Sequence, residues 1–118
     1  MGRQLAFWRY EKGTYLDCKT VFELACIEEK KVSGLLTLPL NDILEKVSEV
    51  FSDYDKHDLL NYENSKGSFT ISGTEQAVLF DCSWNMEYDD LNRIIGIMQR
   101  FGCPFYDPQI ETRFDGHQ

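Results

Sequence analysis

The sequence of 118 residues has few of the residues and motifs that most catalytic and metal sites require. It contains two histidines, no cysteine pair with C-x-x-C spacing, and no H-E-x-x-H, G-x-S-x-G, P-loop or G-x-G-x-x-G motif. His117 is next to the C-terminus, so only His57 is placed to act as a base, and nothing in the sequence brings it to a cysteine. We therefore expect no enzymatic activity, no cofactor and no metal.

Long apolar runs are also missing. A membrane-spanning helix needs ~20 apolar residues, whereas the run Leu35–Leu40 is broken by Thr37 and Pro39. The charged N-terminus is not followed by the apolar segment of a secretory signal. We therefore expect a cytoplasmic protein. Its four cysteines are predicted to stay reduced and to lie in or near the core, namely Cys18, Cys26, Cys82 and Cys103.

Positive charge is scarce, because 12 lysines and arginines stand against 20 acidic residues, which gives a net charge of −8 and a pI near 4.6. Such a chain is repelled by phosphate backbones and anionic membranes, so we expect neither as a partner. The acidic residues are concentrated: residues 42–63 hold seven against two lysines, and residues 81–90 hold four and no basic residue. Aromatic residues are interleaved with both segments, as Tyr54, Tyr62, Trp84 and Tyr88.

Hydrophobic periodicity predicts three amphipathic helices, over residues 18–30 behind the N-cap Asp17, near 40–51, and over 87–101. Short β-rich runs, some alternating and some continuously apolar, predict strands over 4–10, 59–63, 68–72 and 77–82. The last of these is the most apolar and is expected to be central.

Residues 104–118 are expected to form an extended tail with at most a short edge strand, on which Phe105 and Tyr106 point to opposite sides. The order of elements predicts a single α+β domain over residues 1–118. It is expected to be a two-layer sandwich in which three helices cover one face of an antiparallel sheet of about four or five strands.

Two acidic groups invite a chemical interpretation. The segment 53–58 begins like a calcium loop, but Asp58 stands where that loop needs glycine and Asn64 where it needs glutamate, so we interpret it as a solvated acidic loop. Glu87, Asp89 and Asp90 have the composition of an acid–base pair. Carboxylates at a helix start also complement the positive end of the helix dipole, and this interpretation is favoured.

Several segments together resemble a small family of uncharacterised bacterial proteins. The most specific is residues 102–109, which match the pattern G-C-P-x-Y-D-P-Q. Weaker matches are Phe7-Trp8-Arg9, Val21-Phe22-Glu23, Gly34-Leu35, Leu38-Pro39, Ile43-Leu44, Phe80-Asp81-Cys82 and Asp90-Leu91-Asn92-Arg93. Such proteins are similar to immunity proteins of contact-dependent inhibition and other polymorphic toxin systems, which bind the toxin domain of their own strain. No catalytic residue is implied by the resemblance.

The leading hypothesis is thus a cytoplasmic immunity protein that covers the active site of a basic nuclease toxin. Carboxylates would steer the encounter and aromatic side chains would anchor the complex. The predicted partner-binding residues are Asp53, Asp55, Asp58, Trp84, Tyr88, Asp89 and Asp90. The alternatives are a regulatory or scaffold domain unrelated to toxins, a small enzyme or metal protein, and acidic residues that serve solubility alone.

Overall fold

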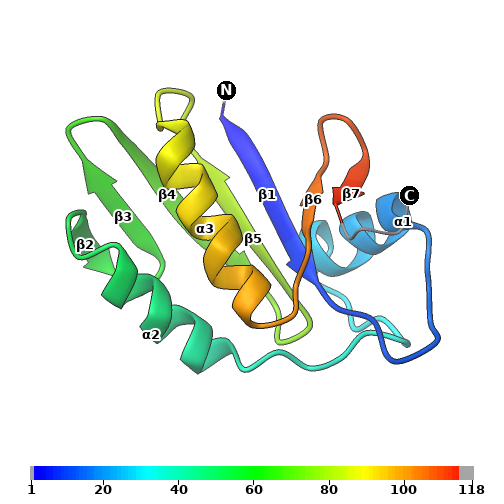
Figure 1. The fold of residues 1–118 in the computed structure, drawn as a ribbon. Coiled ribbons are helices and arrows are strands. Elements are labelled where there is room, and N and C mark those ends of the chain that lie inside the picture. The colour runs from blue at the N-terminus through cyan, green and yellow to red at the C-terminus, as the bar shows by residue number, and fades with distance from the viewer. Residues whose placement is uncertain (1, 115–118) are drawn as a thin grey trace.

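A computed structural model describes residues 2–114, and the expected α+β class is confirmed (Figure 1). His117 and the end of the predicted tail lie outside these residues. No helix in the described part is long and apolar enough to cross a bilayer. In chain order the elements are β1 (Arg3–Trp8), α1 (Cys18–Val21), η1 (Phe22–Ile27), α2 (Leu40–Val50), β2 (Asp55–Asp58), β3 (Asn61–Asn64), β4 (Gly67–Gly73), β5 (Ala77–Cys82), α3 (Tyr88–Arg100), β6 (Phe105–Asp107) and β7 (Thr112–Phe114).

All strands belong to one antiparallel sheet in the order β2-β3-β4-β5-β1-β6-β7. The central position of β5 is confirmed. It pairs with β1 over six residues, from Arg3 opposite Cys82 to Trp8 opposite Ala77. Because successive side chains of a strand point to opposite faces, both strands bury large residues on both sides of the sheet.

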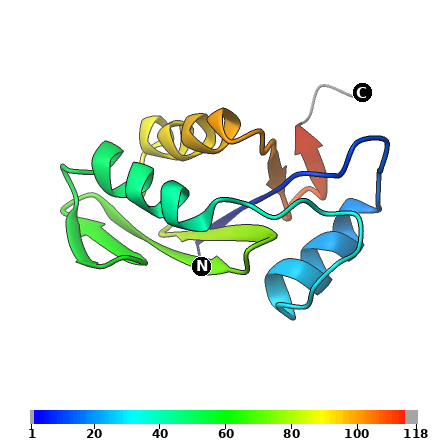
Figure 2. The same ribbon diagram turned by 90° about the horizontal axis from the view of Figure 1, so that it is seen from below.

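Helices α2 and α3 cover one face of the sheet (Figure 2). Leu5 and Phe7 of β1, and Val78 and Phe80 of β5, point to this side. They pack against the apolar stripes predicted for the two helices, and the Phe7 and Phe80 rings meet edge to face with centroids 5.7 Å apart. The buried helix residues are Ile43, Leu44, Val47, Leu91, Ile94, Ile97 and Met98.

The first helical segment lies on the other face, which corrects the expectation that all three helices share one side (Figure 2). Its apolar residues Val21, Ala25 and Cys26 pack against side chains of β1 and β5 that point to this second face, among them Ala6 and Trp8. Amphipathicity shows that a helix has a buried side, but it does not show which sheet face receives it.

This helical segment is also shorter than predicted. Asp17 caps α1 by accepting a hydrogen bond from the backbone N–H of Thr20 at 3.1 Å, as expected. The continuation η1 is a π-helix, in which the N–H of Glu28 bonds the carbonyl of Glu23 at 2.9 Å. The chain then leaves the helix at Glu29, whose φ of 54° is left-handed.

The sheet has seven strands because two further pairings form at its edges. Strand β2 replaces the expected acidic loop, and all four of its side chains are exposed. At the other edge the tail folds into a β6–β7 hairpin. Phe105 and Tyr106 point to opposite faces as predicted, and Tyr106 is 1% exposed against Trp8 and Phe22.

The cysteines follow the prediction of core or near-core thiols. All four are free, three are buried, and Cys18 is half-buried. Burial raises the thiol pKa of Cys26 and of Cys82 to about 12, and that of Cys103 to about 11. These three thiols are therefore protonated at neutral pH.

Two glycines give a matched test of the fold. Gly73 has φ +124°, and a Cβ there would collide with the carbonyl of Ala77 across the turn between β4 and β5. Gly96 lies inside α3, where a Cβ meets nothing within 4 Å. We expect Gly73→Ala to lower the free energy of unfolding by about 1–3 kcal/mol. Gly96→Ala should raise it by up to about 1 kcal/mol. Urea denaturation measures both, and equal effects would contradict the strained turn.

Candidate protein-binding surface

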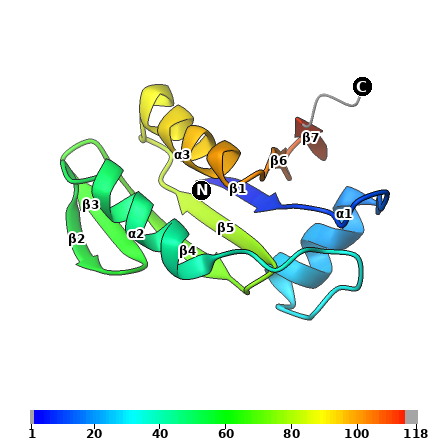
Figure 3. The ribbon, with the colours of Figure 1, turned by 60° about the horizontal axis from the view of Figure 1, so that its bottom comes forward.

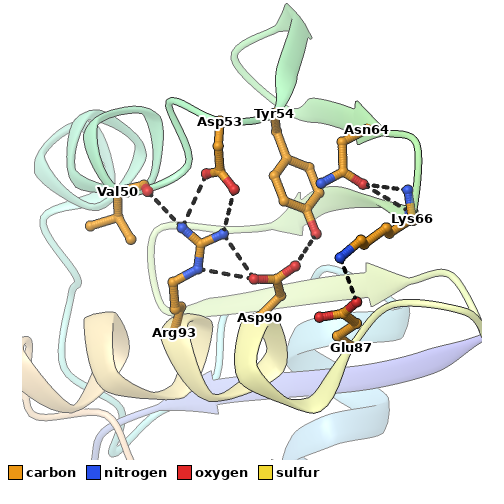
Figure 4. A network of polar contacts seen from close by, with 9 residues as sticks. Val50, Asp53, Tyr54, Asn64, Lys66, Glu87, Asp90 and Arg93 are labelled. Carbon is orange, nitrogen blue, oxygen red and sulfur yellow. Dashed lines mark hydrogen bonds and ion pairs between the residues drawn. The ribbon is translucent and has the colours of Figure 1, made fainter.

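Arg93 joins carboxylates of the two acidic segments, and it lies 40 residues along the chain from Asp53, the first of them (Figure 4). Its guanidinium donates two hydrogen bonds of 3.1 Å to the carboxylate of Asp53, just after α2, and bonds of 3.1 and 2.9 Å to Asp90 in the first turn of α3. It also donates to the carbonyl of Val50 at 2.9 Å and lies 4.2 Å from the ring centroid of Phe51. Arg93 therefore ties the end of α2 to the start of α3.

Tyr54 completes this network, since its hydroxyl donates to Asp90 at 2.7 Å. Burial, followed by that hydrogen bond, raises the pKa of Tyr54 well above its usual value. The hydrogen bonds from Arg93 hold the pKa of Asp53 below its usual range. Asp53 and Asp90 thus already have a cationic partner within the fold, and their negative charge is partly neutralised.

A second cluster forms where β1 begins and α3 starts. The guanidinium of Arg3 lies 4.7 Å from the ring centroid of Tyr88 and 5.4 Å from that of Trp84, and it donates to the Tyr88 hydroxyl at 2.9 Å. Both rings remain largely exposed, Trp84 at 66% and Tyr88 at 68%. Cation–π contacts thus hold two large aromatic side chains in place on the surface.

The third feature is the part of the sheet that no helix covers. Figure 3 shows α1 beside one end of the sheet, where η1 contacts β5 and part of β4. The outer part of that face, formed by β2, β3 and the rest of β4, has no helix over it. The register aligns Gln4, Asp81, Thr70, Asn61 and Asp58 in one row across five strands. Side-chain hydrogen bonds link Gln4 to Asp81, Thr70 to Asn61, and Asn61 to Asp58 at 2.9–3.0 Å.

A neighbouring row adds more negative charge, because Asp55 lies opposite Glu63, which contacts His57 at 3.2 Å. We call Asp55, Asp58, Glu63 and Asp81 the acidic sheet face; all four are exposed. The positive side chains of these strands point the other way. Arg3 reaches Tyr88 of α3, and Lys56 donates to Ser48 of α2 at 3.0 Å.

Asp58 also has a local role in the hairpin between β2 and β3. Its carboxylate accepts from the backbone N–H of Leu60 at 2.7 Å, an Asx turn that leaves Leu59 and Leu60 exposed at the tip. This hydrogen bond, together with those from Asn61, lowers the pKa of Asp58.

Six of the seven predicted partner-binding residues therefore fall into three groups. Asp53 and Asp90 belong to the Arg93 network, Trp84 and Tyr88 flank Arg3, and Asp55 and Asp58 lie on the acidic sheet face. Asp89 is exposed in the first turn of α3. Sequence reasoning did not select Arg3, Arg93, Glu63 or Asp81. One local signal was available in the sequence: Glu63 alternates with Tyr62, and Asp81 with Phe80. This alternation places the two carboxylates on the sheet face opposite to the core under α2 and α3.

Comparison with known proteins finds no matching family model, curated protein or solved structure. In residues 2–114, no group of three or more His, Cys, Asp or Glu side chains is arranged to hold a metal ion.

The Arg93 network makes a prediction about stability. Arg93→Met removes the cationic donor of Asp90, which is 16% exposed and keeps only the hydrogen bond from Tyr54 among those described, and it removes the side-chain donor of the Val50 carbonyl. We expect a loss of about 1–3 kcal/mol in the free energy of unfolding. Arg100→Met in the exposed last turn of α3 is the control, with an expected change within about 0.5 kcal/mol.

The ion pair between Arg93 and Asp53 also predicts that stability depends on pH. Because the pKa of Asp53 is lower in the folded chain than in the unfolded chain, its contribution is present above pH ~4 and is lost as pH falls through the folded pKa. The effect is small because the Asp53 side chain is 58% exposed. Denaturation curves between about pH 6 and 2.5 should show a shallower acid loss for Arg93→Met than for the wild type. Parallel curves would mean that Arg93 does not perturb Asp53.

Proposed function

We propose that the protein is a non-catalytic immunity protein that binds a basic nuclease toxin domain in the cytoplasm and covers its active site. The observation that carries the proposal is the acidic sheet face. Four exposed carboxylates lie on a sheet surface without a helix over it, and the basic side chains of the same strands point to the opposite side. The complementary surface is a cationic one, such as the nucleic-acid cleft of a nuclease.

The geometry of the face suits a partner that docks as a rigid body. Strands β3, β4 and β5 are paired along their length, so Glu63 and Asp81 are held on a stiff surface, and β2 adds Asp55 and Asp58 at the edge by pairing with β3. The hydrogen bonds along the row of side chains that runs across the sheet from Gln4 to Asp58 also restrict these side chains. This lowers the conformational entropy that they lose on binding. Charge at such a surface acts mainly on the association rate and on partner choice.

Trp84 and Tyr88 supply the second element of the proposal. Tryptophan and tyrosine are enriched among the side chains that dominate binding energy. These two rings are held by Arg3 at the end of the sheet where β5 leaves for α3. Because Arg3 points to the side of α3, both rings lie around this end of the sheet from the acidic sheet face. We infer that a partner that reaches around this end is anchored by the rings after the carboxylates have steered the encounter.

The first experiment identifies the partner. The protein should capture the polypeptide encoded immediately upstream of it, and its expression should rescue cells that express that polypeptide. Capture without toxicity of the captured polypeptide would favour a regulatory or scaffold domain instead. Absence of both capture and rescue would contradict the proposal.

Charge reversal then tests the acidic sheet face. The double variant Asp55→Lys/Asp81→Lys should slow association with the upstream polypeptide by about tenfold or more at low salt. Asp42→Lys/Glu45→Lys on the outside of α2 changes the net charge equally and should have a much smaller effect. Stopped-flow rates at low and high salt make the comparison. Equal slowing by the two doubles would show that net charge alone matters.

Truncation of Trp84 tests the anchor. Trp84→Ala should increase the dissociation rate at least tenfold while changing the association rate little. Leu36→Ala removes an exposed apolar side chain in the chain segment after η1 and serves as the control. An unchanged dissociation rate would contradict the proposal that Trp84, together with Tyr88, anchors the complex.

A further inference from the structure

A hollow of about 180 Å³ lies where the β6–β7 hairpin turns away from the first half of β1 (Figure 1). Strand β6 pairs with β1 at two positions, so within residues 2–114 no strand lies beside Arg3–Leu5 on this side. Pro108 has no N–H for a further bond to β1, and Asp107 begins a turn by accepting from the backbone N–H of Gln109 at 2.9 Å. The end of β6 thus opens a notch in the sheet, and α3 forms its second wall. We call this hollow the β1–β6 notch.

The inner walls of the β1–β6 notch are apolar. Leu5 of β1 and Leu91 of α3 are buried there, whereas Ile95 of α3 and Phe105 of β6 are half-buried. Leu91 and Ile95 share one face of α3 because they lie four residues apart. Apolar surface that lines a hollow and is incompletely covered is where a ligand gains free energy by displacing water.

Two opposite charges line the same hollow without forming an ion pair with each other. Arg3 and Asp107 each lie two positions along a strand from a side chain that faces α3, so both point to that side. Arg3 contacts the rings of Trp84 and Tyr88, and it meets no carboxylate within residues 2–114. Asp107 likewise has no cationic partner in this part of the chain.

Both charged groups keep hydrogen-bonding capacity for a ligand. A guanidinium has several N–H donors, and the one described hydrogen bond of Arg3 is that from Nη2 to the Tyr88 hydroxyl at 2.9 Å. Asp107 uses Oδ1 for its turn, and Oδ2 accepts no hydrogen bond among the described residues. Arg3 is therefore able to bind a carboxylate, and Asp107 an ammonium group. A ligand that carries both charges beside an apolar group matches this lining.

We propose that the β1–β6 notch binds a free α-amino acid with an apolar side chain of about the size of leucine. Its carboxylate pairs with Arg3, its ammonium group pairs with Asp107, and its side chain packs against Leu91, Ile95 and Phe105. The volume of about 180 Å³ is below the range of about 300–1,000 Å³ for drug-sized ligands, which limits the ligand to a small molecule of this kind. This binding needs the protein alone and does not depend on the proposed toxin partner.

Calorimetry and amide NMR spectra of the full chain with leucine, leucinamide and N-acetylleucine test the proposal. Leucinamide lacks the carboxylate and N-acetylleucine lacks the ammonium group. Leucine should bind with a Kd of about 0.1–1 mM and each derivative about tenfold or more weakly, with shifts centred on residues 3–5, 88–95 and 105–109. No binding of leucine, equal binding of either derivative, or shifts centred elsewhere would overturn the proposal.

Matched variants test the two charges separately. Asp107→Asn keeps an oxygen for the turn but removes the charge, and it should weaken leucine binding by about tenfold or more. Asp42→Asn, in the exposed first turn of α2, changes the net charge equally and should bind leucine like the wild type. Arg3→Gln is the reciprocal test, in which leucine should lose its advantage over leucinamide. Equal affinities of Asp107→Asn and Asp42→Asn for leucine would contradict recognition by Asp107.

Discussion

The pairing of β1 with β5 is the constraint on which the rest of the structure depends. Both strands bury side chains on both faces, so each face must be covered by a helix where these buried side chains lie. Helices α2 and α3 cover the side of Leu5 and Phe80, and α1 with η1 covers the side of Ala6 and Leu79. Strands β3 and β4 bury side chains on the first side only, because Tyr62 and Phe69 alternate with polar residues. The second face therefore has no helix over β2, β3 and part of β4, and the acidic sheet face is a consequence.

Arginines decide how the remaining charge is distributed. Arg93 neutralises part of the acidic cluster between α2 and α3, so those carboxylates hold the fold together as well as lying at its surface. Arg3 contacts two exposed aromatic rings, Trp84 and Tyr88, and not a carboxylate, and it holds both rings in place. Arg9 and Arg113 stand with Lys12 beyond the end of β1.

Local sequence patterns determined most of the elements. The stripes of α2 and α3, the Asp17 cap, the central position of β5 and the opposite directions of Phe105 and Tyr106 all follow from spacing along a few turns or one strand. Two strands, β2 and β7, were not predicted from the sequence because they form through pairing with another strand and not through a local pattern. Asp55–Asp58 has the composition of a loop and becomes a strand by pairing with β3, and Thr112–Phe114 does so by pairing with β6.

By itself the sequence determined an acidic α+β chain with three amphipathic helical segments and a buried central strand, since periodicity and net charge are sums over neighbouring residues. Tertiary structure alone decided which sheet face each helix covers, which carboxylates Arg93 neutralises, and that Asp55 and Asp81 share one surface. Each of these joins residues from distant parts of the chain, and such contacts depend on sheet order and register. The spacing of residues in the sequence predicts neither the order of the strands nor their register.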